Sequence, residues 1–216
     1  MLLVFFGWAC KEKPDKVKPK VEEAKKPSKA IIKVSPTIKE LAKFADLPLT
    51  DATDINELIL FREIDINGVV TEIDDDRAVA LYKKMTKRGA AISFPIFEIK
   101  NNDTAIIPLQ GVGFGGAIWA KVLIDRNTLE IKKIAFEHKA ESDDYGGAMT
   151  QTSFENQFIG KKINLEEKTF WLQKAIEKSN DDGHLIDGIS GATVTNEGIV
   201  EMLNVGLQRY RNYLQE

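Results

Sequence analysis

The chain has 216 residues, of which 43% are hydrophobic, with 30 basic and 33 acidic side chains. This composition suits one domain with a sizeable core and is too apolar for a disordered chain. The net charge of −3 gives no global reason to expect nucleic-acid binding. A single cysteine, Cys10, excludes an internal disulfide and a metal site built on a cysteine pair.

Residues 1–10 are apolar up to Cys10. The run is too short to span a bilayer as a helix, but it resembles the end of a bacterial lipoprotein signal followed by the lipid-bearing cysteine. Ala9 fits that pattern, whereas Gly7 and Trp8 fit it poorly, and a basic leader is missing. The pattern predicts lipid attachment at Cys10 and anchoring at the cell membrane. An apolar stub with an unmodified cysteine is the alternative.

The next segment, 11–30, is basic and extended in character. Between residues 11 and 29 there are eight lysines and four acidic residues, with several prolines and almost no apolar side chains. Such a segment cannot pack, so we predict a flexible, solvated tether, which would be electrostatically favourable beside an anionic leaflet. A solubilising tail is the alternative. Residues 31–216 are then expected to form one folded domain.

Local patterns predict helices and a strand in the first part of this domain. Ser35 before an apolar 3–4 spacing predicts a capped helix over 36–45. Residues 66–73 have the composition of a strand. The segment 74–89 has acidic residues at its start and basic residues at its end, which predicts a helix over this range. The run Asp74–Asp76 could indicate a cation site, but a helix start explains it more simply.

The middle of the chain alternates short β-branched or aromatic runs with polar turns. Strands are predicted over 93–100, 104–111, 115–125 and 129–139. Helices are predicted over 168–179 and 195–216; in the latter Ile199, Met202, Leu203, Leu207, Tyr210 and Leu214 share one face. We therefore expect an α+β fold with a mostly antiparallel twisted sheet and flanking helices.

One segment near the chain end combines small residues and hydroxyl groups. Gly188 and Gly191 allow tight turns and close approach of a ligand. Ser190, Thr193 and Thr195 supply hydroxyls just before or within the start of the last helix. The free N–H groups and positive dipole end of a helix favour a phosphate. The segment therefore predicts a phosphate site, and an ordinary helix start is the alternative.

This segment also carries a resemblance to a known family. "DGISGAT", residues 187–193, resembles the flavinylation motif of the FMN-binding domains. These domains occur in the subunit designated C of sodium-translocating NADH:quinone reductases and in its counterpart, designated G, in the related Rnf complex. The resemblance implies that FMN is joined through its phosphate to Thr193. It also implies a separate flavin transferase, which makes the phosphoester from FAD and needs the acidic Asp187.

The resemblance extends over about residues 50–210. "HKAESDDYGGAMT", residues 138–150, is similar in spacing to the family's "HGETPGLGG". Asp143-Asp144 replaces Pro-Gly, and Tyr145 replaces the leucine that packs near the flavin ring. The implied cofactor site, without a metal, consists of Asp187, Gly188, Ser190, Gly191, Ala192, Thr193, Thr195, Glu141, Ser142, Tyr145 and Gly146.

Other chemically active residues are less informative. The two histidines, His138 and His184, are expected to be surface or capping residues, with His138 nearer the flavin segment. The glycine run 111–116 lacks the spacing of a dinucleotide fingerprint and leads into a strand, which argues against a Rossmann fold. Phe114 and Trp119 could stack near the ring, although core packing is the expected role.

These features predict an electron-transfer flavoprotein subunit with covalent FMN and no catalytic side chain of its own, because the flavin carries the electrons. The resemblance implies partners among the subunits of a membrane-bound, sodium-translocating NADH:quinone reductase, and a domain facing the periplasm or cell exterior. A stand-alone extracytoplasmic flavin carrier and a lipid-anchored binding module without flavin are the alternatives.

Overall fold

The computed structural model describes residues 34–50, 53–86, 92–173 and 184–216. These residues belong to one folded unit, which spans 32–216. The predicted lipid-attachment residue, Cys10, and the predicted tether over 11–30 lie outside the described residues.

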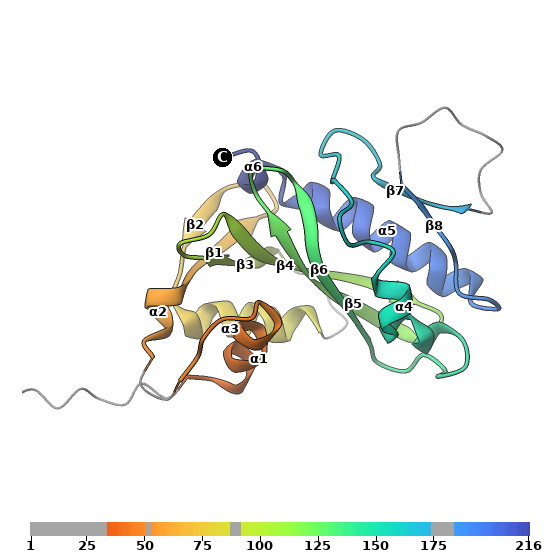
Figure 1. Ribbon diagram of the computed structural model, residues 1–216, viewed down its shortest axis with the longest axis horizontal. Coiled ribbons are helices and arrows are strands. Elements are labelled where there is room, and N and C mark those ends of the chain that lie inside the picture. Colours follow the sequence, from red (N-terminus) through yellow and green to blue (C-terminus); the bar gives the residue numbers. More distant parts are fainter. Residues whose placement is uncertain (1–33, 51–52, 87–91, 174–183) are drawn as a thin grey trace, which may run out of the picture. The chain divides into compact units, whose positions relative to one another are not determined.

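A six-stranded sheet forms the centre of this unit (Figure 1). Its order is β2-β1-β3-β4-β5-β6, and every neighbouring pair is antiparallel. The strands are β1 Ile59–Asp65, β2 Val70–Glu72, β3 Ser93–Ile99, β4 Thr104–Gly113, β5 Gly116–Asp125 and β6 Glu130–His138. The predicted α+β class with an antiparallel sheet is therefore confirmed.

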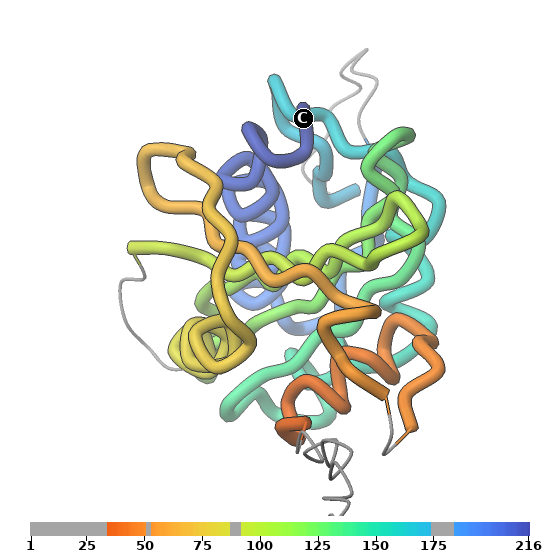
Figure 2. Tube along the Cα trace, turned by 90° about the vertical axis from the view of Figure 1, so that its left-hand side faces the viewer, coloured from red at the N-terminus to blue at the C-terminus, as the bar shows by residue number. Residues whose placement is uncertain are grey.

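Helices cover both faces of the sheet (Figures 1 and 2). On one face lie α1 Pro36–Phe44 and α3 Asp75–Met85, and on the other lies the long α5 Thr193–Arg209. Shorter elements are α2 Ile55–Leu58, the 3₁₀ helix η1 Gly146–Thr150, α4 Thr152–Glu155 and α6 Arg211–Leu214. Side-chain caps start α1 and α3: Ser35 Oγ accepts the Ile38 N–H at 3.2 Å, and an Asp74 carboxylate oxygen accepts the Arg77 N–H at 2.7 Å.

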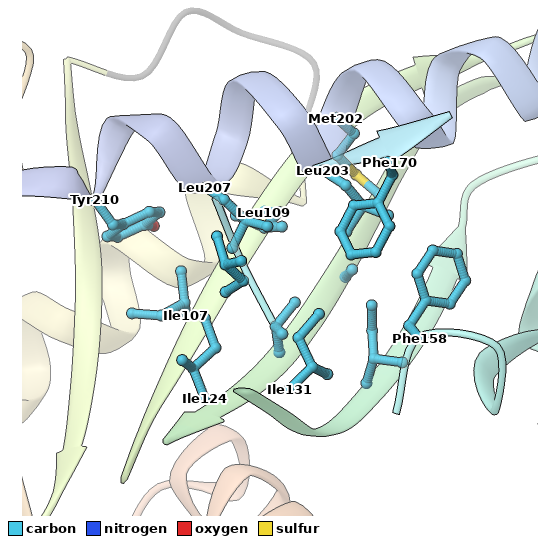
Figure 3. Close-up of a cluster of buried hydrophobic side chains, with 14 of the residues drawn as sticks. Ile107, Leu109, Ile124, Ile131, Phe158, Phe170, Met202, Leu203, Leu207 and Tyr210 are labelled. Atoms are coloured by element: carbon cyan, nitrogen blue, oxygen red, sulfur yellow. The ribbon is translucent and has the colours of Figure 1, made fainter. Parts of the chain in front are cut away.

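The larger core lies between α5 and the sheet (Figure 3). Met202, Leu203 and Leu207 of α5 pack with Ile107 and Leu109 of β4. All six residues predicted to share a face of the last helix are buried. Burial of large aliphatic side chains of this kind contributes about 1.5–3 kcal/mol each before entropy costs. This packing fixes α5, and with it the start of the helix, against β4.

Two predicted elements have different bounds in the structure. Only Val70–Glu72 of the predicted strand 66–73 forms a strand, because the preceding residues turn around Asp65. The Asp65 carboxylate accepts the N–H groups of Val69 at 2.9 Å and Asn67 at 2.8 Å, which holds the pKa of this carboxyl group below its ordinary value. The predicted helix 195–216 begins earlier, at Thr193, and breaks at Tyr210.

The predicted helix over 168–179 is wrong in its described part. Phe170–Leu172 form strand β7, which pairs in parallel with β8, His184–Ile186. The cause is Asn204 of α5, whose Oδ1 accepts the backbone N–H groups of Thr169 at 2.8 Å and Phe170 at 3.0 Å. The side-chain amide holds this backbone extended. Residues 174–179 lie outside the described residues.

Candidate functional site

Most of the predicted site residues meet at one cavity of about 330 Å³. It lies at the start of α5, between the tip of the β4–β5 hairpin and the loop after β6. Predicted members that line it are Glu141, Ser142, Tyr145, Gly146, Gly191, Ala192, Thr193 and Thr195. These residues come from two segments that are far apart in the chain, and the structure brings them together around one cavity.

The other three predicted members, Asp187, Gly188 and Ser190, belong to the loop before α5 and do not line the cavity. Asp187 is exposed, and its backbone is held by Gln157, whose Oε1 accepts the Asp187 N–H at 2.8 Å. This arrangement leaves the Asp187 carboxylate on the surface, where another protein can reach it.

Asn196 holds the loop against the helix that follows it. Its Oδ1 accepts the Ile189 N–H at 2.9 Å, and its Nδ2 donates to the Ile189 carbonyl at 2.8 Å. Two hydrogen bonds to the same residue fix the loop's direction as it enters α5. Sequence reasoning missed this role, because an asparagine inside a predicted helix is usually a solvent-facing residue.

The start of α5 suits an anion. The N-cap position is Ala192, whose side chain offers no hydrogen-bond acceptor, whereas Ser35, Asp54 and Asp74 cap α1, α2 and α3 with side-chain oxygens. Thr193, the first residue of α5, is exposed and lines the cavity. The N–H groups of the first helical turn and the helix dipole favour a negatively charged group at this position.

Glu141 joins three segments of the site. It is 8% exposed. Its Oε1 accepts the Gly115 N–H at 2.7 Å and its Oε2 accepts the Thr195 hydroxyl at 2.8 Å. Thr195 Oγ1 in turn accepts the Phe114 N–H at 3.3 Å. The carboxylate therefore ties the loop after β6 to the hairpin tip and to the first turn of α5, which indicates a positioning role.

Two glycines of the site lie so close to neighbouring side chains that a larger residue would not fit. A Cβ atom on Gly146 would lie 2.2 Å from Glu141 Oε2, so a larger residue there would displace the carboxylate. Gly191 has φ +75°, which L-residues adopt with strain, and a Cβ there would lie 2.8 Å from two ring carbons of Tyr145. The ring of Tyr145 thus packs directly on the loop that precedes Thr193.

The two histidines have different surroundings. His138 Nδ1 accepts the Glu141 N–H at 3.1 Å, so in the neutral ring the proton is on Nε2. His184 Nε2 lies 3.0 Å from the Lys162 carbonyl oxygen. Among the described residues, no three histidine, cysteine, aspartate or glutamate side chains are grouped as a metal site. His138 therefore supports the site loop, and His184 joins two surface segments.

The expected core role of Phe114 is wrong. Its side chain is 83% exposed at the tip of the β4–β5 hairpin, where it lines the cavity. Trp119 is half-buried in β5 and lies on the same sheet face as Lys121, which pairs with Glu40 of α1, so it is on the side away from α5. The glycine run around Phe114 forms this hairpin, in agreement with the rejection of a dinucleotide fold.

Comparison with known proteins points to the same family as the motif. Residues 113–208 match the FMN-binding domain family. This range contains every residue that lines the cavity, from Phe114 to Thr195. The resemblance predicted from the sequence is thus confirmed, and the match supports FMN as the cofactor of this domain.

Two relatives that are similar to this chain in sequence carry the same name. The chain is 28% identical over 134 residues to the subunit designated C of the Na(+)-translocating NADH-quinone reductase of Vibrio alginolyticus, covering 58% of this chain and 52% of that protein. It is 30% identical over 104 residues to the subunit of the same name from Yersinia pestis, covering 47% and 39%. The matched region spans about half the length, or less, of these relatives.

Solved structures agree with the fold. The crystal structure of the subunit of this name from Parabacteroides distasonis matches with a TM-score of 0.63 at 26% identity, over 83% of this chain and 92% of that one. Shewanella oneidensis NqrC matches with a TM-score of 0.62 at 19% identity, over 82% and 97%, which supports the fold alone. Within the ranges that the structure describes, no helix is long and apolar enough to cross a bilayer.

Proposed function

We propose that the chain is an electron-transfer flavoprotein in which FMN is attached through a phosphoester to the hydroxyl of Thr193. The observation that carries the proposal is the position of Thr193, the last residue of "DGISGAT". It is exposed, begins α5 and lines the cavity directly after the loop 187–192. The hydroxyl is accessible to an enzyme, and a phosphate there would meet the positive end of the helix.

The residues of the cavity fit such a cofactor. Gly191 lets the loop turn directly before Thr193, and Gly146 leaves room for the Glu141 carboxylate that positions the surrounding segments. Once bound, the flavin would supply the one- and two-electron redox chemistry. The chain's own residues hold the phosphate, fix the loop through Asn196 and present the ring site at the surface.

We also propose roles for the remaining predicted residues. Asp187, exposed and held by its backbone, is the contact for a flavin transferase. Ser190 and Gly188 complete the loop that the transferase recognises. Thr195 and Ser142 act through hydrogen bonds within the site: Thr195 binds Glu141, and the Ser142 carbonyl accepts the Tyr145 N–H at 3.0 Å.

The printed names of the relatives support a wider proposal. We infer that the chain passes electrons as a subunit of a membrane-bound, sodium-translocating NADH:quinone reductase-type complex, with residues 31–216 as the FMN-binding domain on the outer side of the membrane. Lipid attachment at Cys10 and a tether over 11–30 would connect it to the membrane. Purification of the native complex through this chain, followed by a sodium-dependent NADH–quinone assay, tests this wider role.

The decisive experiment for the cofactor is intact mass. The protein is co-expressed with a flavin transferase and exported, and a denaturing gel is viewed under ultraviolet light. The wild type should gain the mass of one FMN less one water and give a fluorescent band, whereas Thr193→Val should give neither. An unmodified wild type, with the transferase active on a control substrate, would refute covalent attachment and leave the segment as a helix start.

A further inference from the structure

The loop 187–192 is held at two points by side-chain amides that lie outside it. Gln157, in the turn after α4, bonds twice to Asp187: its Oε1 accepts the Asp187 N–H at 2.8 Å, and its Nε2 donates to the Asp187 carbonyl at 3.2 Å. Asn196 of α5 bonds in the same way to Ile189, at 2.9 and 2.8 Å. Each amide exchanges two hydrogen bonds with one residue, as a residue of a neighbouring antiparallel strand would. The backbone of the loop is therefore fixed at residues 187 and 189.

The core fixes both partners of the first of these contacts. Gln157 lies between the buried residues Phe154 and Phe158, whose ring centroids are 5.5 Å apart. Asp187 directly follows Ile186 of β8, which is also buried. The Gln157 amide therefore connects two backbone segments that are themselves anchored, and it has little freedom to bond elsewhere.

The carboxylate of Asp187 takes no part in this contact. Both hydrogen bonds from Gln157 go to the main chain of Asp187, and the residue is exposed. Among the described residues, none makes a hydrogen bond or an ion pair with this carboxylate. Gly188, between the two held residues, has no room for a side chain, since a Cβ there would lie 2.8 Å from Asn196 Nδ2. The loop thus presents a free negative charge from a fixed backbone.

We propose that Gln157 is a positioning residue for flavin attachment: it holds Asp187 where a flavin transferase contacts the carboxylate while the hydroxyl of Thr193 reaches FAD. This inference rests on the proposed attachment of FMN at Thr193. In that reaction the bond between Thr193 Oγ and the flavin phosphorus forms, the phosphoanhydride bond of FAD breaks, and AMP leaves as the hydroxyl proton is released. A loop that is fixed before the encounter loses less conformational entropy when the transferase binds it. Gln157 lies outside "DGISGAT", so the motif alone should be a poor substrate.

Kinetics of a purified transferase, with FAD and the unflavinylated protein as substrates, test this role. Gln157→Met keeps the length of the side chain and removes both hydrogen bonds to Asp187. Ordering the backbone of one residue corresponds to a factor of about 5 to 30, so kcat/KM for the protein should fall by about 5- to 30-fold. Gln208→Met is the matched control. The Gln208 amide donates to the Glu167 carbonyl at 3.3 Å, outside the loop, and its loss should leave kcat/KM unchanged.

Amide hydrogen exchange, measured by NMR on the unflavinylated proteins, reports on the contact without the transferase. In Gln157→Met the Asp187 amide should exchange faster than in the wild type. The Ile189 amide, which Asn196 holds, should keep its rate. Urea unfolding of the same proteins establishes that the variant is folded under the conditions of the kinetic assay.

The outcomes separate this inference from the proposed function. A wild type that a demonstrably active transferase leaves unmodified refutes attachment at Thr193. A folded Gln157→Met protein that is flavinylated with the kcat/KM of the wild type overturns the positioning role of Gln157 while attachment stands. Equal exchange rates of the Asp187 amide in the variant and the wild type would likewise show that the Gln157 amide does not fix the loop.

Discussion

Valine in place of Thr195 should destabilise the domain, whereas the same substitution at Thr193 should leave stability unchanged and abolish covalent flavin. Both changes replace a hydroxyl by a methyl group of similar size. Thr195 is 1% exposed and its hydroxyl donates to Glu141 Oε2 at 2.8 Å while accepting the Phe114 N–H at 3.3 Å. Thr193 is exposed at the cavity. The two positions thus form a matched pair.

The magnitude of the effect at Thr195 depends on the hydrogen bonds lost. A hydrogen bond to a charged group contributes about 1.5–3 kcal/mol, and the longer bond from Phe114 contributes at the low end of the usual range, near 0.5 kcal/mol. Thr195→Val should therefore lower the free energy of unfolding by about 2–3.5 kcal/mol. A domain of this size loses roughly 2–4 °C in Tm per kcal/mol, so the Tm should decrease by about 4–14 °C.

Urea unfolding and thermal melts, followed by far-ultraviolet circular dichroism, measure this effect on the unflavinylated proteins. The gel fluorescence of proteins co-expressed with a transferase measures flavin attachment. The expected result is a destabilised, flavinylated Thr195→Val protein and a stable, unmodified Thr193→Val protein. A Thr195→Val protein within about 0.5 kcal/mol of the wild type would show that the Glu141–Thr195 hydrogen bond does not hold the site together.

Three further predictions concern α5 and its surroundings. Gly198→Ala should lower the free energy of unfolding, measured by urea titration, by about 1–3 kcal/mol, because a Cβ there would lie 2.2 Å from a backbone oxygen of β4. Gly206→Ala is the control. Its Cβ would lie 3.0 Å from a side-chain carbon, and its effect on stability should be near neutral because alanine is the better helix former. Burial raises the pKa of Glu155, although the N–H of Phe136 that it accepts opposes the shift. A carboxyl group with a raised pKa stabilises the fold below its ordinary pKa and loses that contribution as the pH rises through the folded value. Glu155→Gln should therefore gain stability relative to the wild type as the pH rises from about 4 to 7; equal pH profiles would contradict this. Asn196→Ala should slow flavin attachment in a timed transferase reaction by loosening the loop before α5, and an unchanged rate would remove its proposed role.

Much of the fold is predictable from local pattern. The β-branched runs predict four of the six strands of the sheet, β3 to β6, with their order along the chain, because hairpin connections between short segments lead to antiparallel pairing. The 3–4 spacing of apolar residues predicts α5, since this face is buried over its whole length. In these elements the local pattern and the tertiary packing favour the same structure.

The errors arise where distant residues decide the outcome. Phe170–Leu172 lie in the segment 168–179 that is predicted to be a helix. Asn204, more than 30 residues later, accepts the N–H groups of Thr169 and Phe170 and holds the segment as a strand. Phe114 has the hydrophobicity of a core residue, but its position at the tip of a hairpin leaves it exposed. A short stretch of sequence cannot reveal contacts between residues that are so far apart in the chain.

The candidate site shows why one threonine of the segment is open to a cofactor and the next is not. Successive helical residues are rotated by about 100°, so Thr193 and Thr195 point in directions roughly 200° apart around α5. Because α5 packs on β4, one of the two hydroxyls must face inward, where it binds Glu141, and the other must face the cavity opening. The helix register set by the core residues Ile199, Met202 and Leu203 therefore selects Thr193 as the accessible hydroxyl, and a shift of the register would exchange the two roles.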